Sequence, residues 1–195
     1  MVVKHLVLKA LEESIRVNEG FIKGNVDLLL SVAQRLATCF AAGHKLLIFG
    51  NGGSAADAQH IAAELVNRFA VDRKPLPAMA LTTDTSVLTS ISNDFSFDEV
   101  FSKQIRAFGK KDDIAWGIST SGNSPNVLKA VEAAKQIGLY TLGMTGAGGK
   151  LADVADLVLR VESDSTARVQ ETHITIAHIL CELVDRILFP QAFEE

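Results

Sequence analysis

Cysteine is scarce in this sequence. The 195 residues include only Cys39 and Cys181, which lie far apart in apolar stretches with helical periodicity. They form no CxxC pair and are too few for a disulfide scaffold, which excludes small disulfide-stabilised secreted folds. We therefore expect both thiols to be reduced and to lie in the core.

An excess of basic charge is also absent. The 19 Lys and Arg residues stand against 23 Asp and Glu residues, which gives a formal net charge of −4. Without a basic excess, neither the phosphates of a nucleic acid nor an anionic membrane surface would attract the chain. We expect no nucleic-acid partner and no membrane partner, whereas binding to another protein stays open.

Long apolar runs are missing as well. No run approaches the ~18 apolar residues that a membrane-spanning helix needs. The first 20 residues contain a short apolar patch, but Glu12 and Glu13 follow it and a small-residue cleavage site is lacking. These features predict a cytoplasmic protein.

The composition that is present is that of a globular domain. Hydrophobic residues make up 48% of the sequence and charged residues 22%, and the mean hydropathy is +0.22. Such a balance excludes a disordered chain and a fibre. A length of 195 residues suits one domain with one sizeable core, so we expect residues 1–195 to form a single domain.

Short apolar runs alternate with helical periodicity along the chain. Residues 4–42 predict an N-terminal helical hairpin with a break near Gly20 and Gly24, and its many apolar positions indicate a subunit partner. Buried strands are predicted at 45–50, 77–81, 113–119, 139–144 and 156–161. Helices are predicted at 54–69, about 97–108, 125–137, about 148–154 and about 166–188. This alternation implies βαβ units, so we predict an α/β fold whose core, about 45–161, is a five-stranded parallel sheet flanked by helices.

The first candidate loop is the glycine-rich segment 50–57 (GNGGSAAD), which follows a strand and opens a helix. Helix N–H groups at such a place can face an anion. No Gly-Lys-Ser/Thr follows, which excludes a Walker A loop. The loop fits a G-x-G-x-x-A dinucleotide fingerprint, but Asp84 lies 34 residues after Gly50 instead of about 20, which disfavours NAD. A plain turn between strand and helix is the other interpretation.

The second candidate loop, 119–125 (STSGNSP), is rich in hydroxyl groups. Ser124 stands where an N-cap belongs and Pro125 where the first helical residue belongs, so a helix is predicted to start here. Hydroxyls and free helix N–H groups form a neutral cradle that suits a phosphate monoester without Lys or Arg. We interpret the loop as a phosphate site, with a serine-rich connection as the alternative.

Two helices carry further candidates. His60 and Glu64 are four residues apart on one helix face, a spacing that suits two metal ligands or an acid–base pair. Gln170 and His178 fall on one stripe of the last helix. From the residues alone, an exposed polar pair and a satisfied core histidine remain open.

Four segments together resemble a known family. They are GNGGSAADAQHIAAEL (50–65), ISNDFSFDEVF (91–101), GISTSGNSPNV (117–127) and ARVQETHITIAHIL (167–180). They resemble the sedoheptulose-7-phosphate isomerases, also called phosphoheptose isomerases, which consist of one sugar-isomerase (SIS) domain. The similarity runs from the first helices to about Pro190. The STSGNS motif alone marks the broad SIS class, and the His and Glu positions in register with it make the resemblance highly specific.

The resemblance implies a three-layer flavodoxin-like fold and a homotetramer with active sites between subunits. It implies conversion of D-sedoheptulose 7-phosphate to D-glycero-D-manno-heptose 7-phosphate, a step toward lipopolysaccharide precursors. It also implies one zinc ion, Zn(2+), per subunit.

The resemblance assigns roles by position. The residues that match phosphate-holding positions are Ser119, Thr120, Ser121 and Ser124. Those that match other substrate-contacting positions are Asn51, Gly52, Gly53, Ser54, Glu64, Asn93, Asp94 and Gln170. The zinc-ligand positions are matched by His60, Glu64, Gln170 and His178, and the catalytic pair by Glu64 and His178.

The chemistry agrees with these residue types. Aldose–ketose isomerisation moves a proton between C1 and C2 through an enediol, so it needs a base and an acid. We expect Glu64 to abstract the proton and His178 to exchange it on the other side, with the reverse order left open. A metal held by mixed N and O ligands would polarise the carbonyl, and zinc suits such ligands.

Two relatives with the same domain are the alternatives. One is a regulator that binds the replication initiator protein; this chain shares with it the segments 81–91 and 183–190 and also Ala167, where some isomerases carry Asp. That regulator lacks the acid at the position of Glu64 and the histidine at that of His178. The other is an SIS domain for amino-sugar phosphates, which lacks the four-residue ligand set. The residues present therefore favour an enzyme.

Overall fold

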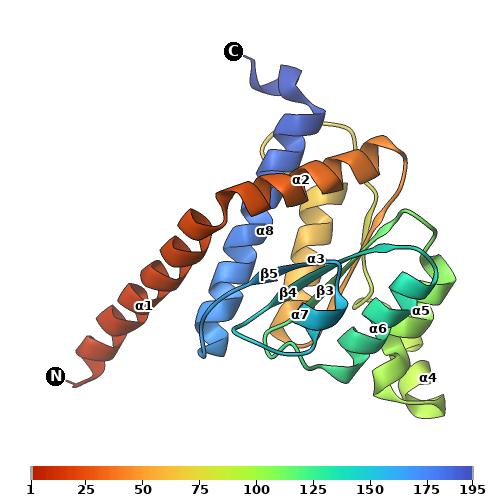
Figure 1. Cartoon of the computed structure of the whole chain (residues 1–195), viewed down its shortest axis with the longest axis horizontal. Coiled ribbons are helices and arrows are strands. Elements are labelled where there is room, and N and C mark those ends of the chain that lie inside the picture. Colours follow the sequence, from red (N-terminus) through yellow and green to blue (C-terminus); the bar gives the residue numbers. More distant parts are fainter. Residues whose placement is uncertain (1, 195) are drawn as a thin grey trace.

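The computed structural model describes residues 2–194 (Figure 1). Two helices open the chain, α1 (Val2–Gly24) and α2 (Val26–Ala41). The sheet and its connections follow as β1 (Leu46–Gly50), α3 (Gly53–Val66), β2 (Ala78–Ala80), α4 (Thr85–Asp94), the 3-10 turn η1 (Phe97–Glu99), α5 (Val100–Phe108), β3 (Ile114–Ser119), α6 (Pro125–Gln136), β4 (Tyr140–Thr145), α7 (Leu151–Val154) and β5 (Leu157–Arg160). The last elements are α8 (Thr166–Leu188) and the 3-10 helix η2 (Pro190–Phe193).

The five strands form one parallel sheet in the order β2-β1-β3-β4-β5. This is the flavodoxin-like order, in which the winding of the chain reverses between β1 and β3. The predicted α/β fold and five-stranded parallel sheet are confirmed. Each strand begins and ends within one residue of its predicted bounds, because short apolar runs between turns mark strands that are buried on both faces.

Alternate side chains of the sheet contribute to two apolar cores. Leu46 and Ile48 of β1 pack with α2, α3 and α8, whereas Leu47 and Phe49 of the same strand pack with α5 and α6. Every residue of β1 and β3 is buried. The sheet is therefore the middle of three layers, as predicted (Figure 1).

The two N-terminal helices do not form the predicted hairpin. Only Asn25 separates α1 from α2, and the two helices run end to end, with α1 projecting away from the sheet (Figure 1). A helical hairpin needs a loop of about 2–5 residues, so one residue is too short to reverse the chain. Both helices pack instead against α8. The predicted break at Gly20 lies inside α1, whereas Gly24 ends it.

Helix α4 is not among the predicted elements. Its sequence, TSVLTSISND, is rich in Ser and Thr, and none of its residues is fully buried; only Leu88 and Ile91 pack against the core, a stripe too short to mark a helix in the sequence. Its start is fixed by Asp84, whose carboxylate accepts a hydrogen bond from the Val87 N–H at 2.9 Å. The start of α4 is therefore marked by this N-cap and not by the hydrophobic pattern.

Both cysteines are free and buried, as expected. Burial raises the pKa of the Cys39 thiol and of the Cys181 thiol to about 12, so both stay protonated. Across residues 2–194, no helix combines the length and the apolar character that crossing a bilayer requires.

Candidate active site

The loops that follow β1 and β3 lie side by side at the carboxyl edge of the sheet. These two strands pair directly, and Gly50 at the end of β1 is in register with Ile118 of β3. The two loops are joined by Asn51 and Asn126, whose amide groups exchange two hydrogen bonds of 2.9 Å. In this sheet order, the place where the winding reverses is the usual ligand crevice. Asn126 was not a predicted site residue, because an Asn in the first turn of a helix carries no distinctive pattern.

The glycine loop makes close contacts with its neighbours at Gly50 and Gly53. Gly52 has φ +54° and begins the turn into α3. A Cβ atom on Gly53 would lie 2.4 Å from Nε2 of Gln170, so the end of the Gln170 side chain lies directly against the start of α3. The structure thus brings the predicted residue Gln170 against the glycine loop. Ser54 is buried beneath the loop, with 3% of its surface exposed.

The serine loop gathers its hydroxyl groups. Oγ of Ser119 lies 2.9 Å from Oγ of Ser124 and 3.4 Å from Oγ of Ser121. Ser124 is the N-cap of α6 and Pro125 is its first residue, as predicted, but the Ser124 side chain makes no capping hydrogen bond. The first N–H groups of α6 are therefore not capped by that hydroxyl, and they lie beside three clustered hydroxyls. Thr120 is half-buried in the same loop.

A cluster of polar side chains forms where α3 meets α8. Nε2 of His60 lies 2.9 Å from Nε2 of His178 and 3.4 Å from Oε1 of Glu64. The ring of Phe69 lies 5.5 Å from the His178 ring, centroid to centroid, and borders the cluster. The structure therefore brings together three residues that are up to 118 positions apart in the sequence. A hydrogen bond between two ring nitrogens needs one donor and one acceptor, so one of the two facing nitrogens carries a hydrogen and the other does not.

The cluster has the donor types of a zinc site. Two imidazoles and a carboxylate are common zinc ligands. Among residues 2–194, however, no three His, Cys, Asp or Glu side chains are arranged as a preformed metal centre. His60 and His178 instead contact each other directly. The donor types fit zinc in chemistry, and His60, Glu64 and His178 would hold it.

Arg73 joins the two helices that carry this cluster. Its Nε donates to Oδ1 of Asp185 at 2.8 Å, and the two side chains are 1% and 0% exposed. Its Nη1 and Nη2 donate to the backbone carbonyls of Leu65 and Glu64 at 2.8 and 3.0 Å. The C-terminal end of α3, with Glu64, is thereby held against α8, with His178. An isolated arginine gives no signal of this kind in the sequence, so the sequence analysis missed it.

Asp57 is a second polar group near the cluster, one turn before His60 on α3. Its Oδ2 is buried without a hydrogen-bond partner. Burial raises the pKa of Asp57 to about 6, and the nearby His60 opposes this rise. Arg68, one turn after Glu64, is exposed.

Two predicted substrate contacts lie apart from these groups. Asn93 and Asp94 are exposed at the C-terminal end of α4, and the Asn93 amide donates to the Asp94 carboxylate at 2.8 Å. Within the described part of the chain, no hydrogen bond joins them to the serine loop or to α3. Their assignment to the site depends on the family resemblance.

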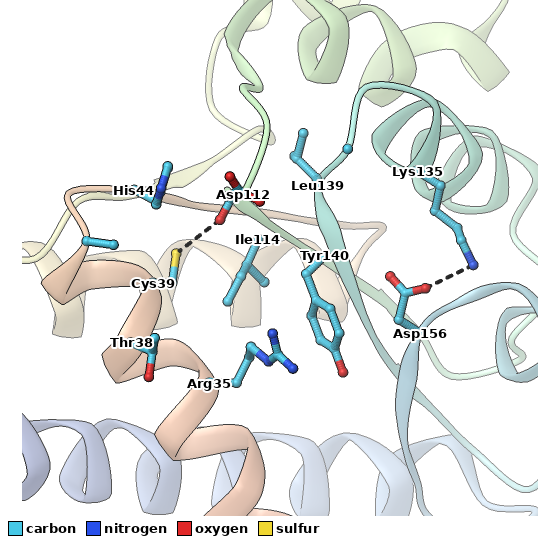
Figure 2. A pocket seen from close by; sticks show the side chains of 12 residues that line it. Arg35, Thr38, Cys39, His44, Asp112, Ile114, Lys135, Leu139, Tyr140 and Asp156 are labelled. Carbon is cyan, nitrogen blue, oxygen red and sulfur yellow. Dashed lines mark hydrogen bonds and ion pairs between the residues drawn. The ribbon is translucent and has the colours of Figure 1, made fainter.

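A cavity of about 660 Å³ lies elsewhere in the molecule (Figure 2). It is lined by Ile114 and Tyr140, the first residues of β3 and β4, and by Arg35 of α2, whose guanidinium lies 4.3 Å from the centroid of the Tyr140 ring. It therefore opens at the amino edge of the sheet, opposite the two loops. None of the predicted site residues lines it.

The chain is similar to known proteins over nearly its whole length. Residues 11–146 match the SIS domain family. The phosphoheptose isomerase of Nitratidesulfovibrio vulgaris is 54% identical over 187 residues, which are 95% of this chain and 90% of that protein. The phosphoheptose isomerase of Thermodesulfovibrio yellowstonii is 53% identical over 190 residues, which are 97% of this chain and 94% of that protein.

Two solved structures have the same fold. The phosphoheptose isomerase GmhA from Neisseria gonorrhoeae has a TM-score of 0.89 and 44% identity, and the match covers 94% of this chain and 98% of that chain. A phosphoheptose isomerase from Francisella tularensis has a TM-score of 0.92 and 37% identity, over 95% of this chain and 100% of that chain.

Proposed function

The chain belongs to the phosphoheptose isomerases of the SIS domain family, and from that premise we propose that it interconverts D-sedoheptulose 7-phosphate and D-glycero-D-manno-heptose 7-phosphate. The observation that carries the proposal is the meeting of His60, Glu64 and His178 between α3 and α8. A carboxylate and an imidazole at one place are the acid–base groups that an aldose–ketose isomerisation needs. A protein-binding regulator would have no use for them.

Glu64 and His178 are proposed to move the protons. In the ketose-to-aldose direction, one proton leaves C1 and one is delivered to C2, while O1 loses its hydroxyl proton and O2 gains one. Glu64, as a carboxylate, takes the proton from C1. His178 exchanges protons on the other side of the enediol, and its hydrogen bond to His60 gives the ring nitrogen a neighbour with which to share a proton. The reversed assignment of the two residues is the alternative.

The serine loop is proposed to bind the phosphate of the sugar. Ser121 and Ser124 offer hydroxyl donors within 3.4 Å of the Ser119 hydroxyl, and the first turn of α6 offers backbone N–H groups. Such donors hold a phosphate dianion without a basic side chain. We assign the sugar chain to the glycine loop and its neighbours, with Asn51, Gly52, Gly53, Ser54, Asn93 and Asp94 as contacts.

Zinc is part of the proposal, with one ion per subunit. His60, Glu64, Gln170 and His178 would hold it, and their nitrogen and oxygen donors support this assignment. When bound, the ion polarises the substrate carbonyl and stabilises the oxyanion that develops there. Glu64 would then have to leave the metal in order to act as the base.

We also propose a homotetramer with its active sites between subunits. The support is on α1, where Leu6, Leu8, Leu11 and Ile15 are each between 55% and 60% exposed on a helix that projects from the body (Figure 1). A run of exposed apolar side chains of this kind is typical of a protein interface. The proposed setting is the cytoplasm, in the synthesis of heptose precursors for lipopolysaccharide.

The test is a coupled assay on the purified protein. It is given sedoheptulose 7-phosphate with and without a chelator, and the aldoheptose phosphate is read by NMR or by a downstream kinase. We expect turnover that falls on chelation and returns with zinc. If elemental analysis shows the protein to be free of zinc and a chelator does not change its turnover, the zinc proposal fails and the isomerase proposal stands. Binding of the sugar phosphate without any turnover would refute the proposed activity.

A further inference from the structure

His173 is a buried residue of α8 that the proposed mechanism does not use. Its surface is 0% exposed, and its Nε2 lies 3.2 Å from the carbonyl oxygen of Thr145, the last residue of β4. A carbonyl can only accept, so Nε2 carries the hydrogen and donates it. The same carbonyl accepts the Val161 N–H at 2.9 Å. His173 and Val161, the residue after β5, therefore both hydrogen-bond to the end of β4, with the His173 ring in a single tautomer.

The turn that follows Thr145 lies against the serine loop. The Thr145 hydroxyl donates to the carbonyl of Gly148 at 3.0 Å. A Cβ atom on Gly122, which has φ +64°, would lie 2.3 Å from that carbonyl oxygen and 2.7 Å from Thr145 Oγ1. The turn and the loop are thus in contact at a point where only glycine fits.

Three hydrogen bonds connect the turn to the loop. The Gly146 N–H donates to the Thr120 carbonyl at 3.0 Å, and the Leu151 N–H donates to the Gly122 carbonyl at 2.9 Å. The Lys150 N–H donates to the side-chain oxygen of Asn123 at 3.1 Å. The conformation of the serine loop is therefore set by the turn 146–151, which continues from the strand end that His173 holds.

We propose that His173 is a positioning residue for phosphate binding, which acts through Thr145 and the turn 146–151 on the serine loop 119–124. The inference rests on the proposed function only in taking that loop as the phosphate site. Nδ1 of His173 is buried and has no hydrogen-bond partner. A residue that served only to fill the core would be apolar, because an unpaired buried polar atom is unfavourable. Leucine has a similar size but no hydrogen-bond donor. The donor at Nε2 is therefore what distinguishes His173 from an apolar core residue.

The test compares two substitutions of His173 in the full-length protein. His173→Gln keeps an N–H donor at about the same reach, and His173→Leu removes it. We expect His173→Leu to raise both KM for the sugar phosphate and Kd for inorganic phosphate about tenfold, the change for one lost buried hydrogen bond, with kcat changed less than threefold. His173→Gln should stay within about threefold of the wild type, a change of less than 1 kcal/mol.

Matched variants separate positioning from general destabilisation. Leu180→Ala removes a buried side chain two turns further along α8, and Ser121→Ala removes one phosphate donor directly. Equal increases of KM in His173→Leu and Leu180→Ala, or no increase in His173→Leu, would overturn the proposal. If His173→Leu does not fold, Thr145→Val tests the next contact in the connection, from the Thr145 hydroxyl to the Gly148 carbonyl, with Thr145→Ser as the conservative variant. Unchanged phosphate affinity in Thr145→Val would overturn the proposed route through Thr145 and the turn.

Phosphate titration separates this inference from the proposed reaction. Inorganic phosphate is titrated into wild type and variants, and the amide NMR signals of Gly122 and Asn123 are followed, which needs no turnover. A wild type that binds phosphate but does not isomerise the sugar would refute the proposed function and leave the role of His173 supported by its variants. A wild type that isomerises the sugar phosphate but shows no phosphate binding at the serine loop would overturn the inference and leave the proposed function.

Discussion

At the scale of single residues, Glu64 is the group on which the proposed reaction depends most directly. Glu64→Gln keeps the size and polarity of the side chain and removes the carboxylate that accepts the proton. We expect turnover to fall by about 100-fold or more, the usual contribution of a general base. The fold should be unaffected, because the contact with His60 is partly exposed and even charged pairs at such places contribute roughly 0–1 kcal/mol.

The measurement is the initial rate of aldoheptose phosphate formation, together with the thermal midpoint. Glu182→Gln is the matched control, since Glu182 also lies on a helix, pairs with a neighbour, Arg186 at 2.8 Å, and is not among the proposed site residues. A Glu64→Gln protein that keeps most of its activity would show that another group is the base.

His173 also predicts a dependence of stability on pH. Burial lowers the pKa of His173 to about 4, below its ordinary 6.5. Between these values the unfolded chain binds a proton at His173 and the folded chain does not, so stability falls as the pH falls from 6.5 toward 4. The full effect is roughly 3 kcal/mol. Asp57 works in the opposite direction, because its raised pKa favours the folded state as the pH falls through about 6.

Comparison with His173→Gln isolates the histidine, since Asp57 is present in both proteins. We expect the free energy of unfolding, measured in urea at pH 7 and pH 4, to fall more steeply in the wild type than in His173→Gln. Parallel losses in the two proteins would mean that His173 titrates normally in the folded state.

At the scale of elements, the sequence predicted best what depends on apolar patterning. All five strands were found because each is a short buried run, and α8 was predicted with its bounds at Thr166 and Leu188. The errors concern features that depend on one residue: α4, which begins at the Asp84 cap and has only a short apolar stripe, and the hairpin, which a single residue, Asn25, makes impossible.

The same distinction applies to the site residues, where local spacing was predictive and the packing of distant segments was not. The pair His60 and Glu64 follows from helical spacing, and its meeting with His178 was expected only from the family resemblance, since no local pattern fixes how α3 packs on α8. Arg73, which fixes that packing through Asp185, escaped prediction because a buried ion pair joins residues 112 positions apart.

This ion pair gives the prediction at the element scale. Arg73→Met leaves the buried Asp185 without its partner, and removing one member of such a pair costs about 3–5 kcal/mol of stability. We expect urea denaturation to show that loss, and the double variant with Asp185→Leu to recover part of it. Arg186→Met, which breaks an exposed pair, should change stability by less than about 1 kcal/mol. Equal effects of Arg73→Met and Arg186→Met would show that the buried pair does not hold α3 on α8.

At the scale of the whole molecule, contacts within a single chain do not explain the exposed apolar side chains of α1. It projects from the body and packs against α8, while its opposite side leaves Leu11 and Ile15 56% and 55% exposed (Figure 1). These two residues are four positions apart and so lie on one face of the helix. A second copy of the chain, with the same helix, is the partner that we propose for that face.

The double substitution Leu11→Glu and Ile15→Glu tests this interface. Because both side chains are exposed in the single chain, the variant should keep its helical circular dichroism, whereas charges buried between subunits are strongly unfavourable. We expect analytical ultracentrifugation to show a tetramer for the wild type and smaller species for the variant. Turnover per subunit should fall with the tetramer, because the sites are proposed to lie between subunits; Glu12→Gln on the same helix should change neither. A wild type that is monomeric and active, or a variant that dissociates with full activity, would place each complete active site within one chain.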